Sequence, residues 1–128
     1  MDVWVLLEWV GRIVFAGFFV MSGANHLLRL QGTAAYAQSK GVPVPALATI
    51  VTGLMLLAGG FAILLRWHST LGAALLVAFL VPVAFVMHNF WVEADPMAKA
   101  NQMAQWWKNI ALAAACVLYA VAHHRGAL

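Results

Sequence analysis

Four long apolar segments, separated by short polar stretches, account for most of this chain. They run over Val3–Ala24, Ala46–Leu65, Ser69–Trp91 and Gln105–His123. A helix needs about 20 mostly apolar residues to cross a hydrocarbon core about 30 Å thick, and each segment is close to that length. Lipid offers the backbone no hydrogen-bond partners, so such segments span as helices. The pattern therefore predicts an all-α integral membrane protein, an antiparallel four-helix bundle that forms one domain over residues 1–128.

The longest polar connection, between the first two apolar segments, contains a further helical signal. Thr33–Lys40 has the composition of a helix, and Gly41 follows it as a helix stop. Pro43 and Pro45 then favour an extended backbone before the second apolar segment. We expect a short interfacial helix over Thr33–Lys40 that partly covers one end of the bundle.

Composition and charge support a membrane location. Of the 128 residues, 65% are hydrophobic and only 9% are charged, whereas about 25% of the residues in a soluble domain are charged. The net charge of +3 suits contact with anionic lipid headgroups. The seven Lys and Arg residues are scattered, which argues against a nucleic-acid partner. We therefore expect a multi-pass protein whose partner is the lipid bilayer of the cell inner (cytoplasmic) membrane.

The first apolar segment carries a charged pair. Glu8 and Arg12 are four residues apart, in the order that favours an ion pair on a helix. A lone arginine within hydrocarbon costs about 2.5–3.5 kcal/mol on insertion scales, and pairing lowers that cost. We interpret Glu8 and Arg12 as a structural ion pair that faces the other helices. An anion site or a charge relay is the functional alternative.

Polar residues gather where an up-down-up-down path brings helix ends to one membrane face. Polar groups within membrane segments usually serve a function, and a quinone needs hydrogen-bond donors inside an apolar, aromatic pocket. Histidine, asparagine and lysine can all donate, and the tryptophans nearby could line the mouth of such a pocket. The candidate ligand-binding residues are His26, His88, Asn109, Lys108, Asn25 and Trp91.

Other interpretations of these residues stay open. His26, His88 and Asn109 could instead bond to one another and to the backbone carbonyl that Pro82 frees, which would lock the helices together. Haem ligation by the two histidines is disfavoured because the chain has no haem-attachment motif. A metal site is disfavoured because no cysteine or acidic ligand joins them. The single cysteine, Cys116, excludes exchange between a pair of thiols.

Several short motifs, in order along most of the chain, resemble the DoxX family of small four-helix membrane proteins. The matching segments are Gly11-Arg12, Ser22-Gly23 with Asn25-His26, Ser39-Lys40-Gly41-Val42-Pro43, Thr52-Gly53, Gly59-Gly60, His88-Asn89-Phe90-Trp91, and Lys108-Asn109 with Ala111-Leu112. The family usually has a glutamate between the Thr-Gly and Gly-Gly segments, where this chain has Leu56. The resemblance implies the four-helix fold. It also implies a redox setting, because the family's name is tied to a thiosulfate:quinone oxidoreductase and its members are described as membrane components of redox systems.

These observations predict a small membrane subunit or accessory protein of a redox or electron-transport assembly, recovered with other membrane subunits or as a homo-oligomer. The chain has no cofactor motif, no CxxC and no nucleophile–base pair, so no catalytic residue is assigned. One alternative is a quinone-interacting membrane oxidoreductase that uses a His26/His88/Asn109 pocket. Another is a small transporter or lipid-binding chaperone. We expect both termini in the cytoplasm, as is usual in the family, although the lysine and arginine count alone favours the reverse orientation.

Overall fold

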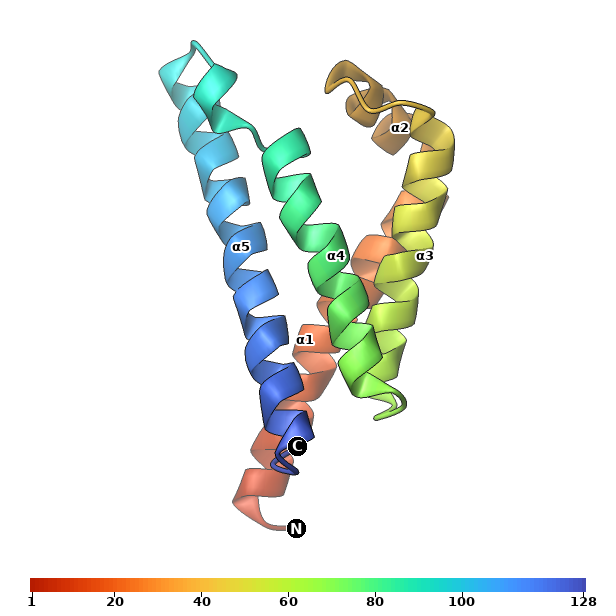
Figure 1. Cartoon of the computed structure of the whole chain (residues 1–128), viewed down its shortest axis with the longest axis vertical. Helices are drawn as coiled ribbons and strands as arrows, with labels where there is room; N and C mark the ends of the chain where they lie inside the picture. Colours follow the sequence, from red (N-terminus) through yellow and green to blue (C-terminus); the bar gives the residue numbers. More distant parts are fainter.

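The computed structural model describes all residues, 1–128, and every regular element in it is helical. The elements are α1 (Val3–Leu28), α2 (Leu30–Ser39), α3 (Pro45–Leu64), α4 (Ser69–Met87), the short 3₁₀ helix η1 (Phe90–Val92) and α5 (Pro96–His124). Four long helices run along the long axis, and α2 crosses one end of the molecule (Figure 1). Both termini lie at the other end, together with the turn between α3 and α4 (Figure 1). The predicted all-α class is confirmed.

Three helices are long and apolar enough to cross a membrane: α1, α3, and α4 together with η1. They make this chain a multi-pass membrane protein. Helix α5 is not among them, because its first half is rich in polar side chains such as Gln102 and Gln105. The fourth crossing over Gln105–His123 therefore stays a prediction.

The helix boundaries correct the sequence prediction in three places. Helix α1 continues to Leu28, and α4 ends at Met87 because His88 leaves the helical conformation, with φ −118° and ψ 44°. Helix α5 begins at Pro96, well before the predicted start at Gln105. Asp95 caps it by accepting a hydrogen bond from the backbone N–H of Ala98. An Asp-Pro pair is a standard start of a helix, so the sequence did contain this signal.

Glycines allow the helices to pack closely. Helix α1 packs along α3, α4 packs along α5, and α3 contacts α4. A Cβ atom on Gly23 would lie 2.7 Å from the carbonyl oxygen of Gly53, and one on Gly72 would lie 2.6 Å from Cβ of Ala62. Small residues at these two crossings let the backbones approach, and the resulting van der Waals packing is one of the interactions that drive helix association in lipid. The core beside them consists of Ala16, Phe19, Leu56, Ile63, Ala73, Leu76, Leu80, Ala113 and Cys116.

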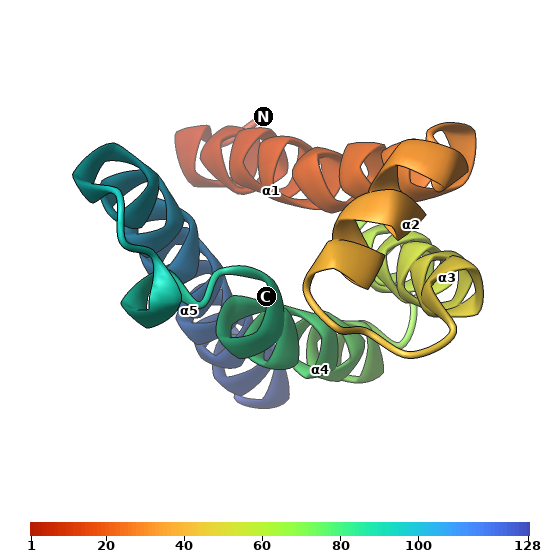
Figure 2. The ribbon, with the colours of Figure 1, turned by 90° about the horizontal axis from the view of Figure 1, so that it is seen from above.

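The two helix pairs, α1 with α3 and α4 with α5, diverge toward the end that α2 crosses (Figure 1). Seen from that end, the four long helices surround a central region, and α2 lies over the part of it next to α3 (Figure 2). The predicted helix between the first two membrane helices exists as Leu30–Ser39 and is followed by Gly41 at φ +80°. Whether it lies at the membrane interface stays a prediction.

Candidate functional site

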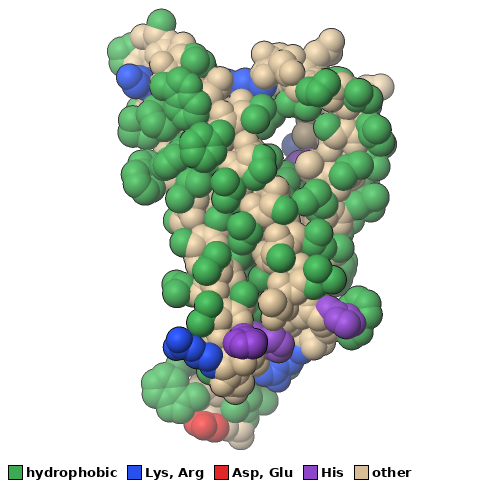
Figure 3. Space-filling view, in the orientation of Figure 1, with side chains coloured by type: hydrophobic (Ala, Val, Ile, Leu, Met, Phe, Trp, Pro, Cys, Tyr) green, Lys and Arg blue, Asp and Glu red, His purple; other side chains and the backbone are tan.

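A cavity of about 380 Å³ lies at the end of the molecule that α2 covers. All five α-helices contribute to its wall, which is mostly apolar and includes Phe18, Phe79 and Leu80. No acidic side chain lines it. The space-filling view shows the hollow below α2, between the upper parts of α3 and α4, with a histidine side chain and a basic side chain within it (Figure 3). This size and polarity are typical of a site for a small apolar ligand with a few polar atoms.

Four of the six candidate residues line this cavity, namely His26, His88, Lys108 and Asn109. Asn25 does not, because it is exposed on α1 about 100° around the helix from its neighbour His26. Trp91 does not either. It follows the end of α4, is half exposed, and packs on Phe85 and Phe90 with ring centroids 6.1 and 5.3 Å away.

Asn109 is the most buried of the cavity's polar residues that have no side-chain hydrogen bond within the chain. It is only 4% exposed, and its side-chain amide forms no hydrogen bond with any group of the chain. Its polar atoms are not sealed inside the protein, because the residue lines the cavity and only Arg12 Nε and Trp106 Nε1 are buried side-chain polar atoms without a partner. Asn109 lies on the buried face of α5, with Ala113 and Cys116. Its amide is therefore available to a molecule in the cavity.

Each cavity histidine uses one ring nitrogen within the protein. Nδ1 of His26 lies 2.8 Å from the backbone carbonyl oxygen of Ser22. The His26 ring also packs edge-on against Phe79, with centroids 5.7 Å apart. Nδ1 of His88 lies 2.9 Å from Oε1 of Gln102. In both rings Nε2 has no partner within the chain, so it is free to bind a ligand.

The other polar side chains of the wall are bonded mainly to nearby groups. Lys108 donates from Nζ to Oε1 of Gln105 at 2.7 Å, and Nζ lies 5.9 Å from the centroid of the Phe18 ring. Thr49 and Thr52 donate to carbonyls one turn earlier in α3, at 2.8 and 2.7 Å. Their hydroxyls can still accept but no longer donate. Lys108 and Asn109 are donors that remain for a ligand, together with the hydroxyls of Ser22 and Thr33, which also line the cavity and have no partner within the chain.

Two residues at the site, Tyr36 and Gln102, are not among the candidates predicted from the sequence. Tyr36 lines the cavity and donates its hydroxyl proton to the carbonyl of Met87 at 3.3 Å. Gln102 donates from Nε2 to the Tyr36 hydroxyl at 2.9 Å and so links α5 to α2. From the sequence, Tyr36 is only part of the predicted helix Thr33–Lys40, and Gln102 lies before the predicted segment Gln105–His123. The Asp95-Pro96 helix start was the signal that could have placed Gln102 on a helix.

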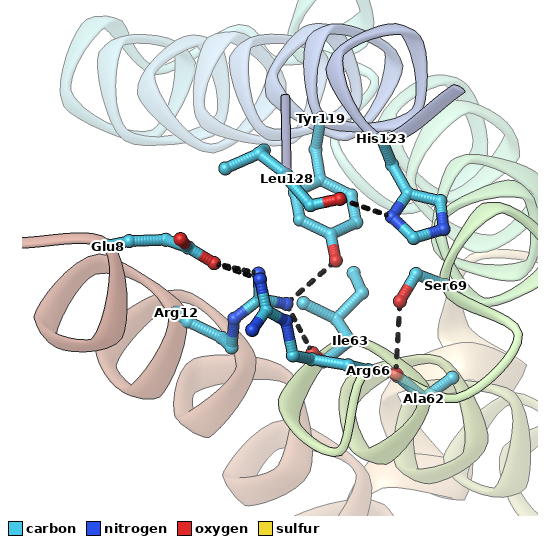
Figure 4. A network of polar contacts seen from close by, with 9 residues as sticks. All are labelled: Glu8, Arg12, Ala62, Ile63, Arg66, Ser69, Tyr119, His123 and Leu128. Carbon is cyan, nitrogen blue, oxygen red and sulfur yellow. Dashed lines mark hydrogen bonds and ion pairs between the residues drawn. The ribbon is translucent and has the colours of Figure 1, made fainter. Parts of the chain in front are cut away.

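A second polar cluster, drawn in Figure 4, lies at the opposite end, which also holds both termini (Figure 1). Nη2 of Arg12 lies 2.5 Å from Oε1 of Glu8. Nη1 of Arg12 donates to the Ile63 carbonyl and to the Tyr119 hydroxyl, both at 2.8 Å. Arg66 also reaches the Glu8 carboxylate, at 2.8 Å. Arg12 therefore faces the protein and joins α1, α3 and α5, an arrangement that suits a structural role.

No group of three or more histidine, cysteine, aspartate or glutamate side chains is placed to hold a metal ion. The cysteine, Cys116, is fully buried among apolar residues. Leu56 lines the cavity and is 1% exposed. It stands at the position where the resemblance to the DoxX family implies a glutamate. The cavity is thus neutral at a position where a carboxylate would have changed its charge.

Comparison with known proteins identifies the family. The DoxX family model matches residues 7–89, more than half of the chain. Inner membrane protein YphA of Escherichia coli (strain K12) is 28% identical over 112 residues, which cover 88% of this chain and 79% of YphA. No solved structure matches the chain. On the extent of the family match, this chain belongs to the DoxX family of membrane proteins.

Proposed function

We propose that this protein is a small inner-membrane component of a redox or electron-transport assembly and that its cavity binds a quinone. The unpartnered amide of Asn109 is the observation that carries this proposal. This amide is open to the cavity and has no partner within the chain, so a ligand carbonyl there can accept a hydrogen bond from it. The relative YphA, an inner membrane protein, supports the location.

The wall of the cavity suits a quinone ring. Phe18, Phe79 and Leu80 offer apolar and aromatic contact, while Asn109 and Lys108 can donate hydrogen bonds to ring oxygens. The volume of about 380 Å³ is within the range of small-molecule sites, about 300–1,000 Å³. The opening between α3 and α4 lies among apolar side chains (Figure 3). A ligand dissolved in the bilayer could enter there without crossing water.

Electrons would have to come from a partner. Reduction of a quinone to a quinol takes up two electrons and two protons, and the fully buried thiol of Cys116 is poorly placed to supply electrons. The sequence has no nicotinamide- or flavin-binding motif. We therefore assign electron donation to a protein of the dehydrogenase class, with this chain as the membrane subunit that holds the quinone. Extraction in mild detergent, followed by native mass spectrometry, should recover it with other polypeptides.

Replacing Asn109 by leucine should weaken quinone binding about tenfold. Leucine has a similar size and removes the donor, at a cost of about one hydrogen bond. Binding of a short-chain ubiquinone analogue to the purified protein in nanodiscs measures the effect. Asn25→Leu is the matched control, because Asn25 is at the same end of the molecule but exposed outside the cavity. Equal affinities for the two variants would contradict the proposal.

The ligand that co-purifies separates this function from its rival. Organic extraction should release a quinone from the wild-type protein and a smaller amount of it from Asn109→Leu, a result that supports quinone binding. Fatty acid or phospholipid in its place would favour the lipid-binding chaperone or transporter instead. A monomer with neither ligand nor partner would contradict the redox-subunit proposal.

The proposed topology has four crossings, with α5 as the fourth and both termini in the cytoplasm. Helix α5 lies along α4 for most of its length, and the two chain ends lie at the same end of the molecule (Figure 1). Fusion of alkaline phosphatase or a fluorescent protein to the carboxyl end tests the orientation. Fluorescence without phosphatase activity is expected, and the reverse pattern would place the termini outside.

A further inference from the structure

The hydrogen bonds of His26 determine which of its ring nitrogens carries the proton. Nδ1 lies 2.8 Å from the carbonyl oxygen of Ser22. A backbone carbonyl can only accept, so Nδ1 must donate. A neutral imidazole carries one N–H, and Nε2 is therefore left with its lone pair. His26 presents an acceptor, whereas the sequence had suggested a donor.

His88 reaches the same state through a longer chain of bonds. The carbonyl of Met87 can only accept, so the Tyr36 hydroxyl donates its proton to it. That hydroxyl then accepts from Nε2 of Gln102, which orients the Gln102 amide and makes its Oε1 the atom that faces His88. Nδ1 of His88 must donate to this oxygen. The free Nε2 of neutral His88 is again an acceptor.

From this arrangement we infer that the cavity recognises the reduced, hydroxyl-bearing form of its ligand, a hydroquinone, through the Nε2 atoms of His26 and His88. The inference rests on the proposed quinone function and makes it more specific. A quinone carbonyl has no proton to offer to these nitrogens, and two facing acceptors repel each other. A hydroquinone O–H donates to such a nitrogen, as a phenol does to neutral imidazole.

The remaining polar groups do not oppose this preference. Asn109 can donate to, or accept from, a ligand oxygen, so it serves both redox forms. Lys108 donates only, and the oxygens of both forms have lone pairs that accept from it. No carboxylate in the wall competes for the hydroxyl protons. Thr49 and Thr52 can only accept, because their protons are donated within α3, so they favour the hydroquinone as the two histidines do.

Equilibrium binding to the full-length protein in nanodiscs tests the inference. The ligands are a short-chain ubiquinol, the matching ubiquinone, and the dimethyl ether of the quinol, compared without oxygen at about pH 8, where model imidazole is neutral. One or two added hydrogen bonds of about 1 kcal/mol each predict about tenfold tighter binding of the quinol than of either other ligand. Equal or tighter binding of the quinone, still dependent on Asn109, would overturn this inference and leave the proposed function standing. If none of the three ligands binds, both the inference and the proposed function are wrong.

A variant of Gln102 adds a readout that does not depend on affinity. Gln102→Leu removes the acceptor that holds the proton on Nδ1 of His88. Nitrogen-15 NMR of the imidazole rings should show the Nδ1–H tautomer for His88 in the wild type and a mixture in the variant, with quinol selectivity reduced about threefold or more. Gln38→Leu is the control, because Gln38 is exposed on α2 and its side chain has no hydrogen bond. An Nε2–H tautomer for both histidines of the wild type would refute the inference outright.

Discussion

Replacing Arg12 by methionine should lower the free energy of unfolding by about 3 kcal/mol, because acceptors on α3 and α5 lose their donor, and each such loss inside a protein costs about 1–3 kcal/mol. The Arg12 side chain is 2% exposed and donates to groups on three helices. Helices α1 and α5 have little direct contact, and the bond from Arg12 to Tyr119 connects them (Figure 4). Methionine keeps much of the volume but leaves the Ile63 carbonyl and the Tyr119 hydroxyl without this donor.

Denaturation in detergent micelles, followed by circular dichroism, measures this change. Arg125→Met makes the same substitution at an exposed arginine that is in no ion pair, and it should change stability by less than about 0.5 kcal/mol. Tyr119→Phe, which removes one acceptor only, should cost about 1 kcal/mol. A variant at Arg12 as stable as the wild type would show that the cluster is not structural, and would reopen the anion-site interpretation.

The structure changes the expected cause of this loss. From the sequence, Glu8 is the only partner predicted for Arg12, so loss of Arg12 would leave Glu8 unpaired. Arg66 is 58 residues further along the chain and reaches the same carboxylate at 2.8 Å. The periodicity of α1 can place Glu8 and Arg12 on one face, but it does not reveal a partner from the turn after α3. The cost therefore comes mainly from the contacts of Arg12 with α3 and α5.

Hydropathy predicted the helices well where they are apolar throughout. The second apolar segment was expected at Ala46–Leu65 and is found as α3 at Pro45–Leu64. Prediction failed at α5, because Lys99–Met103 is polar enough to resemble a loop although it continues the helix. In that stretch the cap at Asp95, and not hydrophobicity, marks the start of the helix. The consequence was that Gln102 was not considered for the site.

The composition of the cavity was partly predictable as well. An antiparallel path brings His26, His88 and Asn109 to one end whatever the details of packing. Which side chains face inward depends on helix rotation and on where α4 ends, so Trp91 was misplaced. The protonated nitrogen of each histidine depends on a carbonyl one turn away for His26, and on Gln102 for His88. No sequence pattern specifies those bonds, and they reverse the assumed role of the histidines from donor to acceptor.

Gly23→Val should separate α1 from α3 and lower the free energy of unfolding by about 3 kcal/mol, at the upper end of the usual cost of overpacking. A Cβ atom at this position would lie 2.7 Å from the carbonyl oxygen of Gly53 and 2.9 Å from the backbone nitrogen of Leu57. Backbone atoms of a helix cannot rotate away as a side chain can, so the helices must move apart. Quinone binding should fall with stability, because His26 follows Gly23 by less than one turn and its Cβ lies against Gly53.

Gly17→Val provides the control within the same helix. A Cβ atom on Gly17 would have no neighbour within 4 Å, so valine there should be tolerated within about 0.5 kcal/mol. Both variants make the same change in α1, so intrinsic helix propensity affects them alike and the difference between them reports packing. The free energy of unfolding in micelles and the quinone affinity in nanodiscs should both be lower for Gly23→Val than for Gly17→Val. If they behave alike, the close approach of α1 and α3 does not hold the cavity together, and its wall must depend instead on α2 and the polar contacts of Tyr36 and Gln102.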